Sequence, residues 1–138
     1  MNEEAFKERT KKVGLRVIKL VTSLPRTREG DILARQLLRS GTSIGANYRS
    51  ACRAKSVPDI ISKLSSVEEE GDESLYWLEL LMESNLVRVK RVWPLHQEID
   101  EIVAMIVASI KTLRNRLKSV KPAKRVDNPK SKTQNPKS

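Results

Sequence analysis

Cysteine, histidine, glycine and aromatic residues are all scarce in this chain. Its 138 residues include one cysteine, one histidine, five glycines and one phenylalanine. A single cysteine, Cys52, cannot form a disulfide within the chain. So few glycines and aromatic side chains argue against a β-sandwich or barrel, which needs many turns and bulky strand residues. The composition instead favours a soluble protein rich in helices.

The sequence has no long hydrophobic run either. Its longest apolar stretch, residues 102–110, is far shorter than the roughly 20 residues that cross a bilayer. The first residues, Met1-Asn2-Glu3-Glu4, are acidic and lack the apolar segment of a secretory signal peptide. We therefore expect a cytoplasmic protein that does not engage a membrane.

Motifs that carry catalysis are also missing. The chain has no phosphate-binding loop, no nucleophile elbow and no Cys-x-x-Cys pair. His96 is the single histidine and no Glu-x-x-His motif occurs, so the paired ligands of a bundle di-iron site are absent. We expect no metal, no cofactor and no enzyme activity, and we interpret Cys52 as a small packed residue.

One alternative concerns Arg91 and His96, which have the Arg-x4-His spacing of HEPN-type ribonucleases. Those enzymes are also all-helical and act on a phosphodiester without metal. Pro94 lies between the two residues and can disturb their geometry. The competing interpretation of His96 is an exposed side chain in the first turn of a helix. The ribonuclease is the least favoured of our functional hypotheses.

Positive charge is abundant, and it is unevenly distributed. The formal net charge is +10. Residues 1–57 hold 13 Lys and Arg against 5 Asp and Glu, whereas residues 58–120 hold 8 against 11. Residues 121–138 hold 6 against 1. Basic segments beside an acidic one suggest a polyanionic partner, although the charge could serve solubility alone.

Apolar residues recur every three or four positions in four stretches, which predicts four amphipathic helices. We expect helices over residues 3–24, 29–55 and 58–85, a linker over 86–93, and a fourth helix that begins at Pro94 and spans about 25 residues. The predicted core positions are Phe6, Val13, Val17, Leu20, Leu24, Leu33, Leu37, Ile44, Tyr48, Ala51, Ile61, Leu64, Leu75, Leu78, Met82, Ile99, Ile102, Val103, Ile106, Ile110, Leu113 and Leu117.

Short connections between long helices predict an all-α fold, an antiparallel up-down-up-down four-helix bundle over residues 1–120. Residues 121–138 contain three prolines, six basic residues and almost no apolar side chains. Such a segment cannot bury enough surface to order itself, so we expect a disordered basic tail.

Small residues form a stripe on the second predicted helix. Gly41 and Gly45 follow Ala34 beside the core positions, and each glycine costs about 1 kcal/mol against alanine in a helix interior. Gly71 leaves a similar gap in the third helix. We expect close packing of another helix at these positions, either from the same chain or from a second copy.

Two polar strips accompany these glycines. Arg39, Ser43 and Asn47 lie four residues apart on the second helix, and Glu70 and Glu73 lie in an acidic stretch of the third. We expect the strips to meet in a buried arginine–carboxylate network that fixes the register of the two helices.

Three segments carry a family resemblance: Gln36-Leu37-Leu38-Arg39-Ser40, Ser43-Ile44-Gly45-Ala46-Asn47-Tyr48 and Glu70-Gly71-Asp72-Glu73-Ser74-Leu75-Tyr76-Trp77-Leu78. They resemble the signature of four-helix-bundle proteins first found as open reading frames in intervening sequences of bacterial 23S rRNA genes. The resemblance covers roughly residues 6–117 and implies a bundle that assembles into a ring, often a homopentamer. A related branch, the accessory proteins of diversity-generating retroelements, binds nucleic acid and a reverse transcriptase.

These observations lead to one functional hypothesis and one main competitor. We expect a non-enzymatic homo-oligomeric scaffold that binds RNA, DNA or a nucleoprotein partner through basic surfaces. The competitor is a protein–protein assembly module without nucleic-acid binding. We expect the aromatic side chains to lie in the hydrophobic core or in a protein–protein interface; these are Tyr48, Tyr76, Trp77 and Trp93. The predicted nucleic-acid-binding residues are Lys11, Lys12, Arg16, Lys19, Arg26, Arg28, Arg35, Arg49, Arg53, Lys55, Lys121, Lys124 and Arg125.

Overall fold

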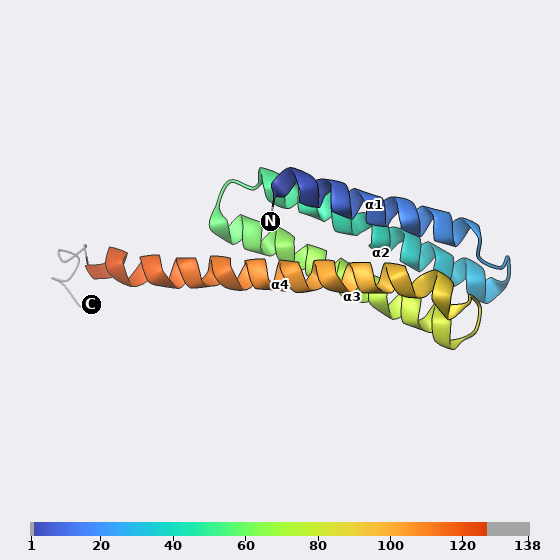
Figure 1. Cartoon of the computed structure of the whole chain (residues 1–138). Helices are drawn as coiled ribbons and strands as arrows, with labels where there is room; N and C mark the ends of the chain where they lie inside the picture. Colours follow the sequence, from blue (N-terminus) through green and yellow to red (C-terminus); the bar gives the residue numbers. More distant parts are fainter. Residues whose placement is uncertain (1, 127–138) are drawn as a thin grey trace.

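The computed structural model describes residues 2–126, which form four helices. These are α1 (Glu3–Thr22), α2 (Arg28–Arg53), α3 (Val57–Glu83) and α4 (Val89–Val126). Successive helices run in opposite directions and pack side by side, α1 on α2, α2 on α3 and α3 on α4, while α1 touches α4 much less (Figure 1). The predicted all-α up-down-up-down bundle is confirmed.

Polar residues mark the boundaries of the first three helices. The side chains of Asn2, Thr27 and Ser56 each accept a hydrogen bond from a backbone N–H in the first turn of the helix that follows. A cap of this kind stabilises a helix by about 1 kcal/mol. Asn85 follows α3 with a φ of 64°, a left-handed conformation that asparagine tolerates and that ends the helix.

The core runs along the middle of the bundle and draws on all four helices. The five predicted core residues of the first helical stretch are all buried, and Leu33, Ile61 and Leu113 are partly buried against the core. Val67 and Leu81 of α3 are fully buried although the periodicity did not single them out. They widen the apolar face of α3, which contacts both α2 and α4.

The start of α4 differs from the prediction, because the helix begins at Val89 and not at Pro94. A proline this close to a helix start removes a single backbone hydrogen bond, so the helix can include it. Val92 and Leu95, three positions apart, are 0% and 3% exposed, and their burial favours the helical conformation of residues 89–93.

The end of α4 differs as well. The helix continues to Val126, so the predicted boundary at residue 120 is six residues too early. Extending a helix that has already formed adds one backbone hydrogen bond per residue, which requires no burial of apolar surface. The rest of the predicted disordered tail, residues 127–138, lies outside the described residues.

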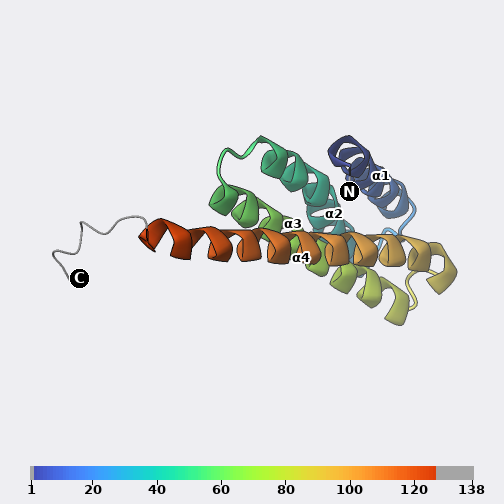
Figure 2. The same ribbon diagram turned by 60° about the vertical axis from the view of Figure 1, so that its left-hand side comes forward.

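Helix α4 is much longer than the other three helices of the bundle. At 1.5 Å per residue its 38 residues span about 57 Å, against about 40 Å for the 27 residues of α3. Figures 1 and 2 both show the C-terminal part of α4 running on past the end of the bundle where α2 meets α3. Among the described residues, no helix is long and apolar enough to cross a membrane.

Candidate nucleic-acid interface

The basic residues predicted on the first half of the chain all reach solvent. Of the described residues in this set, only Arg26 has an ion pair, with its Nε 3.2 Å from Oδ1 of Asp31. The exposed basic residues are Lys11, Lys12, Arg16, Lys19, Arg26, Arg28, Arg35, Arg49, Arg53 and Lys55.

These cations form two stripes. Arg28, Arg35, Arg49 and Arg53 are separated by 7, 14 and 4 residues, spacings that place them on one side of α2; we call them the α2 basic stripe. Lys12, Arg16 and Lys19 share the solvent side of α1 in the same way and form the α1 basic stripe. Because α1 and α2 pack together, the two stripes occupy neighbouring sides of the bundle.

A groove of about 410 Å³ separates the two stripes. Its lining includes the cations Lys7 and Lys11 of α1 and Arg49 of α2, together with the carboxylates Glu4 and Glu8 of α1. Two apolar side chains on the same groove, Leu15 and Ile18, are 57% and 46% exposed. The groove therefore combines charged side chains of both signs with uncovered apolar surface.

The glycines beside this groove let α1 and α2 approach closely. A β-carbon on Gly41 would lie 2.7 Å from Cγ2 of Val17, and one on Gly45 would lie 3.3 Å from Oγ1 of Thr10. The partner helix for this stripe is thus α1 of the same chain. Gly71 has the same role between α3 and α4, since its β-carbon would overlap Cγ2 of Val103.

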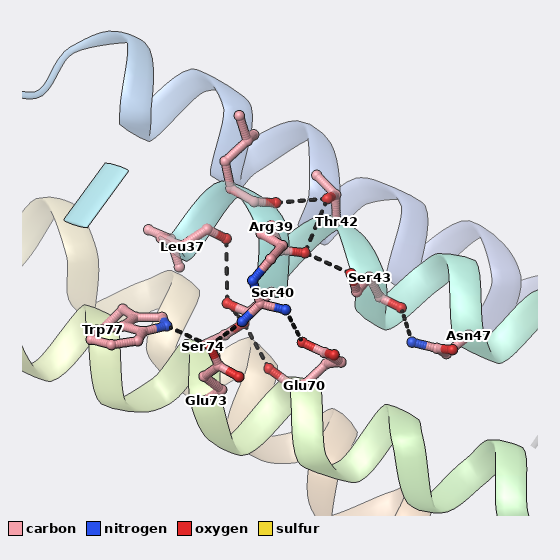
Figure 3. A network of polar contacts seen from close by, with 11 residues as sticks. Leu37, Arg39, Ser40, Thr42, Ser43, Asn47, Glu70, Glu73, Ser74 and Trp77 are labelled. Carbon is pink, nitrogen blue, oxygen red and sulfur yellow. Dashed lines mark hydrogen bonds and ion pairs between the residues drawn. The ribbon is translucent and has the colours of Figure 1, made fainter. Parts of the chain in front are cut away.

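The polar strips of α2 and α3 meet in part (Figure 3). Arg39 pairs with Glu70, at 3.4 Å from Nη1 to Oε1, and with Glu73. Nε1 of Trp77 donates to Oε2 of Glu73 at 3.2 Å. The Arg39 side chain is 52% exposed, so the network lies at the surface and was wrongly expected to be buried. Solvent screens such a pair and limits what it contributes to stability.

Ser43 and Asn47 do not join this network. Oγ of Ser43 donates to the carbonyl of Arg39 at 2.6 Å, and Nδ2 of Asn47 donates to the carbonyl of Ser43 at 3.0 Å (Figure 3). Short polar side chains in a helix readily bond to carbonyls one turn back, which satisfies them within α2.

A buried hydroxyl pair links α2 to α3 beneath these residues, and the sequence analysis missed it. Ser40 and Ser74 are 0% exposed, with their Oγ atoms 2.8 Å apart. Oγ of Ser74 also lies 2.8 Å from the carbonyl oxygen of Glu70, so both hydroxyls are satisfied. The available signal was the position of Ser40, which follows Leu37 by three residues and precedes Ile44 by four on the core stripe.

A second missed contact joins α1 to α4. Nε and Nη2 of Arg9 lie 2.6 and 3.0 Å from the two carboxylate oxygens of Glu98, and Nη2 lies 2.8 Å from Oε1 of Glu101. The hydrogen bonds from Arg9 hold the pKa of Glu98 below its usual value. This bidentate pair connects α1 and α4, which pack against each other less than successive helices do.

The two residues of the ribonuclease hypothesis, Arg91 and His96, both lie on α4. His96 lies in the second turn of α4 and is partly buried, with Nε2 3.0 Å from Oε2 of Glu79 and its ring stacked on Trp93. The expected exposed first-turn position is therefore incorrect. Arg91 is exposed and five residues away on the same helix, a rotation of about 140° around the axis. The two side chains start from different faces of α4.

The remaining candidates behave as packing or surface residues. Tyr48 is buried against Phe6, with ring centroids 4.7 Å apart, whereas Tyr76 and Trp93 are about half exposed. Burial raises the pKa of the Cys52 thiol, which disfavours a reactive thiolate. Within the part of the chain that the structure describes, no three His, Cys, Asp or Glu side chains are grouped to hold a metal ion.

Comparisons with known proteins agree with this architecture. Residues 4–108 match the model of the family described as 23S rRNA-intervening sequence protein. A crystal structure of a protein with unknown function from the S23 ribosomal protein family, from Bacteroides thetaiotaomicron VPI-5482, is 32% identical with a TM-score of 0.74. The match covers 80% of this chain and 99% of that one. A search of curated proteins gives no match. The chain belongs to the 23S rRNA-intervening sequence protein family.

Proposed function

We propose that this protein is a non-enzymatic scaffold, a homo-oligomer in the cytoplasm, that binds nucleic acid or a nucleoprotein partner through the basic residues of α1 and α2. The observation that carries the proposal is the set of ten exposed cations on these helices and the loops at both ends of α2, nine of them without an ion pair among the described residues. A cation without a carboxylate partner can replace the counterions of a phosphate backbone at little cost.

Exposed apolar residues support the oligomeric part of the proposal. Leu15 and Ile18 lie on the groove between α1 and α2, next to Lys11 and Arg49. Apolar surface rimmed by polar residues is typical of protein–protein contacts. Assembly would also repeat the basic stripes in every subunit, which raises avidity for a long polyanion without new contacts per subunit.

Fluorescence anisotropy with labelled RNA and DNA across a salt series tests this proposal. Wild-type protein is compared with a variant of the α2 basic stripe, Arg35→Gln/Arg49→Gln/Arg53→Gln. If the three residues contact phosphates, the log–log salt slope falls by about 2 to 3, since each contact contributes about 0.7 on single strands and 0.9 on B-form duplexes. The matched control, Lys63→Gln/Arg88→Gln/Lys90→Gln, removes the same charge from exposed positions on α3 and near the start of α4.

The outcome separates the proposal from its competitor. Equal slopes for wild type and control, with a lower slope for the α2 variant, support binding by the stripe. If both variants lose the same amount of salt slope, the loss reflects net charge and not the α2 basic stripe. A wild-type protein that binds no nucleic acid near physiological salt, yet has the mass of an oligomer by light scattering, would favour a protein–protein assembly module.

A further inference from the structure

The part of α4 beyond the family match is an extended, uniformly basic helix. We call residues 109–126 the basic arm. It begins where the match to the family model ends, at residue 108, and α4 continues through it to Val126. Figures 1 and 2 show this end of α4 projecting past the ends of the other helices. Its first residues still pack on the bundle, because Ile110 is buried and Leu113 is partly buried against the core, and the residues after them extend the helix.

Charge in the arm is entirely of one sign. Residues 109–126 contain seven Lys and Arg and no Asp or Glu. Some basic side chains elsewhere in the described residues have acidic partners, as Arg9 has Glu98 and Glu101. The four arm cations with described side chains, Lys111, Arg114, Arg116 and Lys118, are exposed, and none has an ion pair within the described residues.

The spacing of these cations gives the arm a charged side. Lys111, Arg114 and Lys118 are three and four residues apart, which places them on one side of the helix at intervals of about 4.5 to 6 Å. The sequence continues the same spacing at Lys121 and Arg125. A rod with positive charge at such intervals complements a phosphate backbone, whose charges recur about every 3.4 Å per strand along a duplex.

The apolar side of the arm argues against a lipid surface as the partner. Helices that lie in a membrane interface need a wide apolar face, commonly with Trp, Phe or several Leu. After Ile110 the arm offers Leu113 and Leu117 as its large described apolar side chains, and both are already partly buried. Residues 109–126 contain no aromatic residue.

We infer that the basic arm is a second nucleic-acid contact of this protein, in which Lys111, Arg114 and Lys118 bind phosphates from one side of a preformed helix. This inference rests on the proposed function, because it assigns the same class of partner to a site apart from the α1 and α2 stripes. Backbone phosphates are common to RNA and DNA, so the binding is independent of sequence.

The test uses full-length protein with the substitutions Lys111→Gln/Arg114→Gln/Lys118→Gln. We expect the log–log salt slope to fall by about 2 to 3 and the affinity at low salt to fall about tenfold or more, with unchanged helix content by circular dichroism. Labelled single-stranded RNA, duplex RNA and duplex DNA show which source of phosphate the arm prefers. The control is again Lys63→Gln/Arg88→Gln/Lys90→Gln.

A second variant separates the charged side from bulk charge. Exchanging Lys111 with Thr112 and Lys118 with Ser119 (Lys111→Thr/Thr112→Lys/Lys118→Ser/Ser119→Lys) keeps the composition and turns each charge by about 100° around the helix. We expect this variant to have a lower log–log salt slope than the wild-type protein. If it binds nucleic acid as the wild-type protein does, the claim that one side of the arm makes the contact is overturned.

The results distinguish this inference from the proposed function. If the arm variant binds like wild type while the α2 variant is weakened, the arm inference fails alone. If the arm variant is weakened and the α2 variant is not, the arm is the contact and the α2 stripe is not. No wild-type binding to any nucleic acid overturns both. Binding to vesicles rich in phosphatidylserine, without binding to nucleic acid, overturns the arm inference in favour of lipid.

Discussion

At the scale of single residues, Gly71 shows how little room separates α3 from α4. A β-carbon there would overlap Cγ2 of Val103, whose side chain is stiff and buried. Alanine gains about 1 kcal/mol over glycine as a helix former, whereas overpacking costs about 1 to 3 kcal/mol. We therefore predict that Gly71→Ala lowers the free energy of unfolding by about 1 kcal/mol, measured by urea denaturation.

Gly14 provides the matched control. A β-carbon at this position would meet nothing nearer than Cα of Thr42, at 4.0 Å. Gly14→Ala should therefore be neutral or raise the free energy of unfolding by up to about 1 kcal/mol. Equal stability of the two alanine variants would contradict the role assigned to Gly71.

The buried hydroxyls of Ser40 and Ser74 give a second prediction at this scale. Each single alanine variant removes one partner of the 2.8 Å contact, and Ser40→Ala/Ser74→Ala removes both. We expect a coupling free energy of about 1 kcal/mol in the double-mutant cycle, with the double variant less destabilised than the sum of the singles. Strictly additive effects would show that the contact contributes nothing.

At the scale of helices, the pair between Arg9 and Glu98 joins the first element to the last. Its hydrogen bonds hold the pKa of Glu98 below the ordinary value of 4.5. A lowered pKa in the folded state means that the stabilising contribution is complete above pH 4.5 and is lost as the pH falls through the lower value. We predict that Glu98→Gln reduces the free energy of unfolding at pH 7 and that the difference from wild type shrinks below pH 4.5.

Urea denaturation at several pH values measures that difference, and Arg9→Gln supplies the control. Once Arg9 is gone, the main cause of the lowered Glu98 pKa is gone too. Glu98→Gln introduced into the Arg9→Gln background should then show little dependence of the difference on pH. A difference that stays constant from pH 3 to 7 in the wild-type background would refute this account.

The helices could be predicted from the sequence because their signals are local. The spacing of residues such as Val13, Val17 and Leu20 reports one face of one helix without reference to the rest of the chain. Which residue of another helix a side chain contacts is not a local property of the sequence. Nothing in the sequence distinguishes Arg9 from other cations of α1 or pairs it with Glu98, 89 residues away. That contact depends on how the helices are placed in space.

In the candidate site, too, local features could be predicted from the sequence, whereas contacts between helices could be predicted only in part. Gly41 and Gly45 signal a close helix contact, but their spacing alone could not decide between α1 and a second copy. Arg39 was correctly placed opposite Glu70 and Glu73, whereas Ser43 and Asn47 found partners within their own helix. Pro94 was taken as the start of the fourth helix, although residues on both sides of it are helical in α4.

At the scale of the whole molecule, the exposed Leu15 and Ile18 lead to a prediction about assembly. Both line the groove between α1 and α2 but contribute little to the core, so Leu15→Glu/Ile18→Glu should leave the unfolding transition nearly unchanged. We expect the variant to have a lower mass than wild type by light scattering. Val89→Glu, at a position 54% exposed on another part of the surface, serves as control and should keep the wild-type mass.

Two results would count against this interface. A wild-type protein with the mass of one chain leaves no assembly to disrupt. A double variant that keeps the wild-type mass would place the subunit contact elsewhere on the bundle.

The projection of α4 has a consequence for how the molecule moves through solution. A rod of about 57 Å on a bundle about 40 Å long makes the particle elongated, so it experiences more friction than a sphere of equal mass. The protein should sediment slowly and tumble anisotropically, with rotation about the axis of α4 faster than end-over-end rotation of that axis. Amide ¹⁵N relaxation should therefore differ between residues with N–H bonds along that axis, as in α4, and residues of the connecting loops.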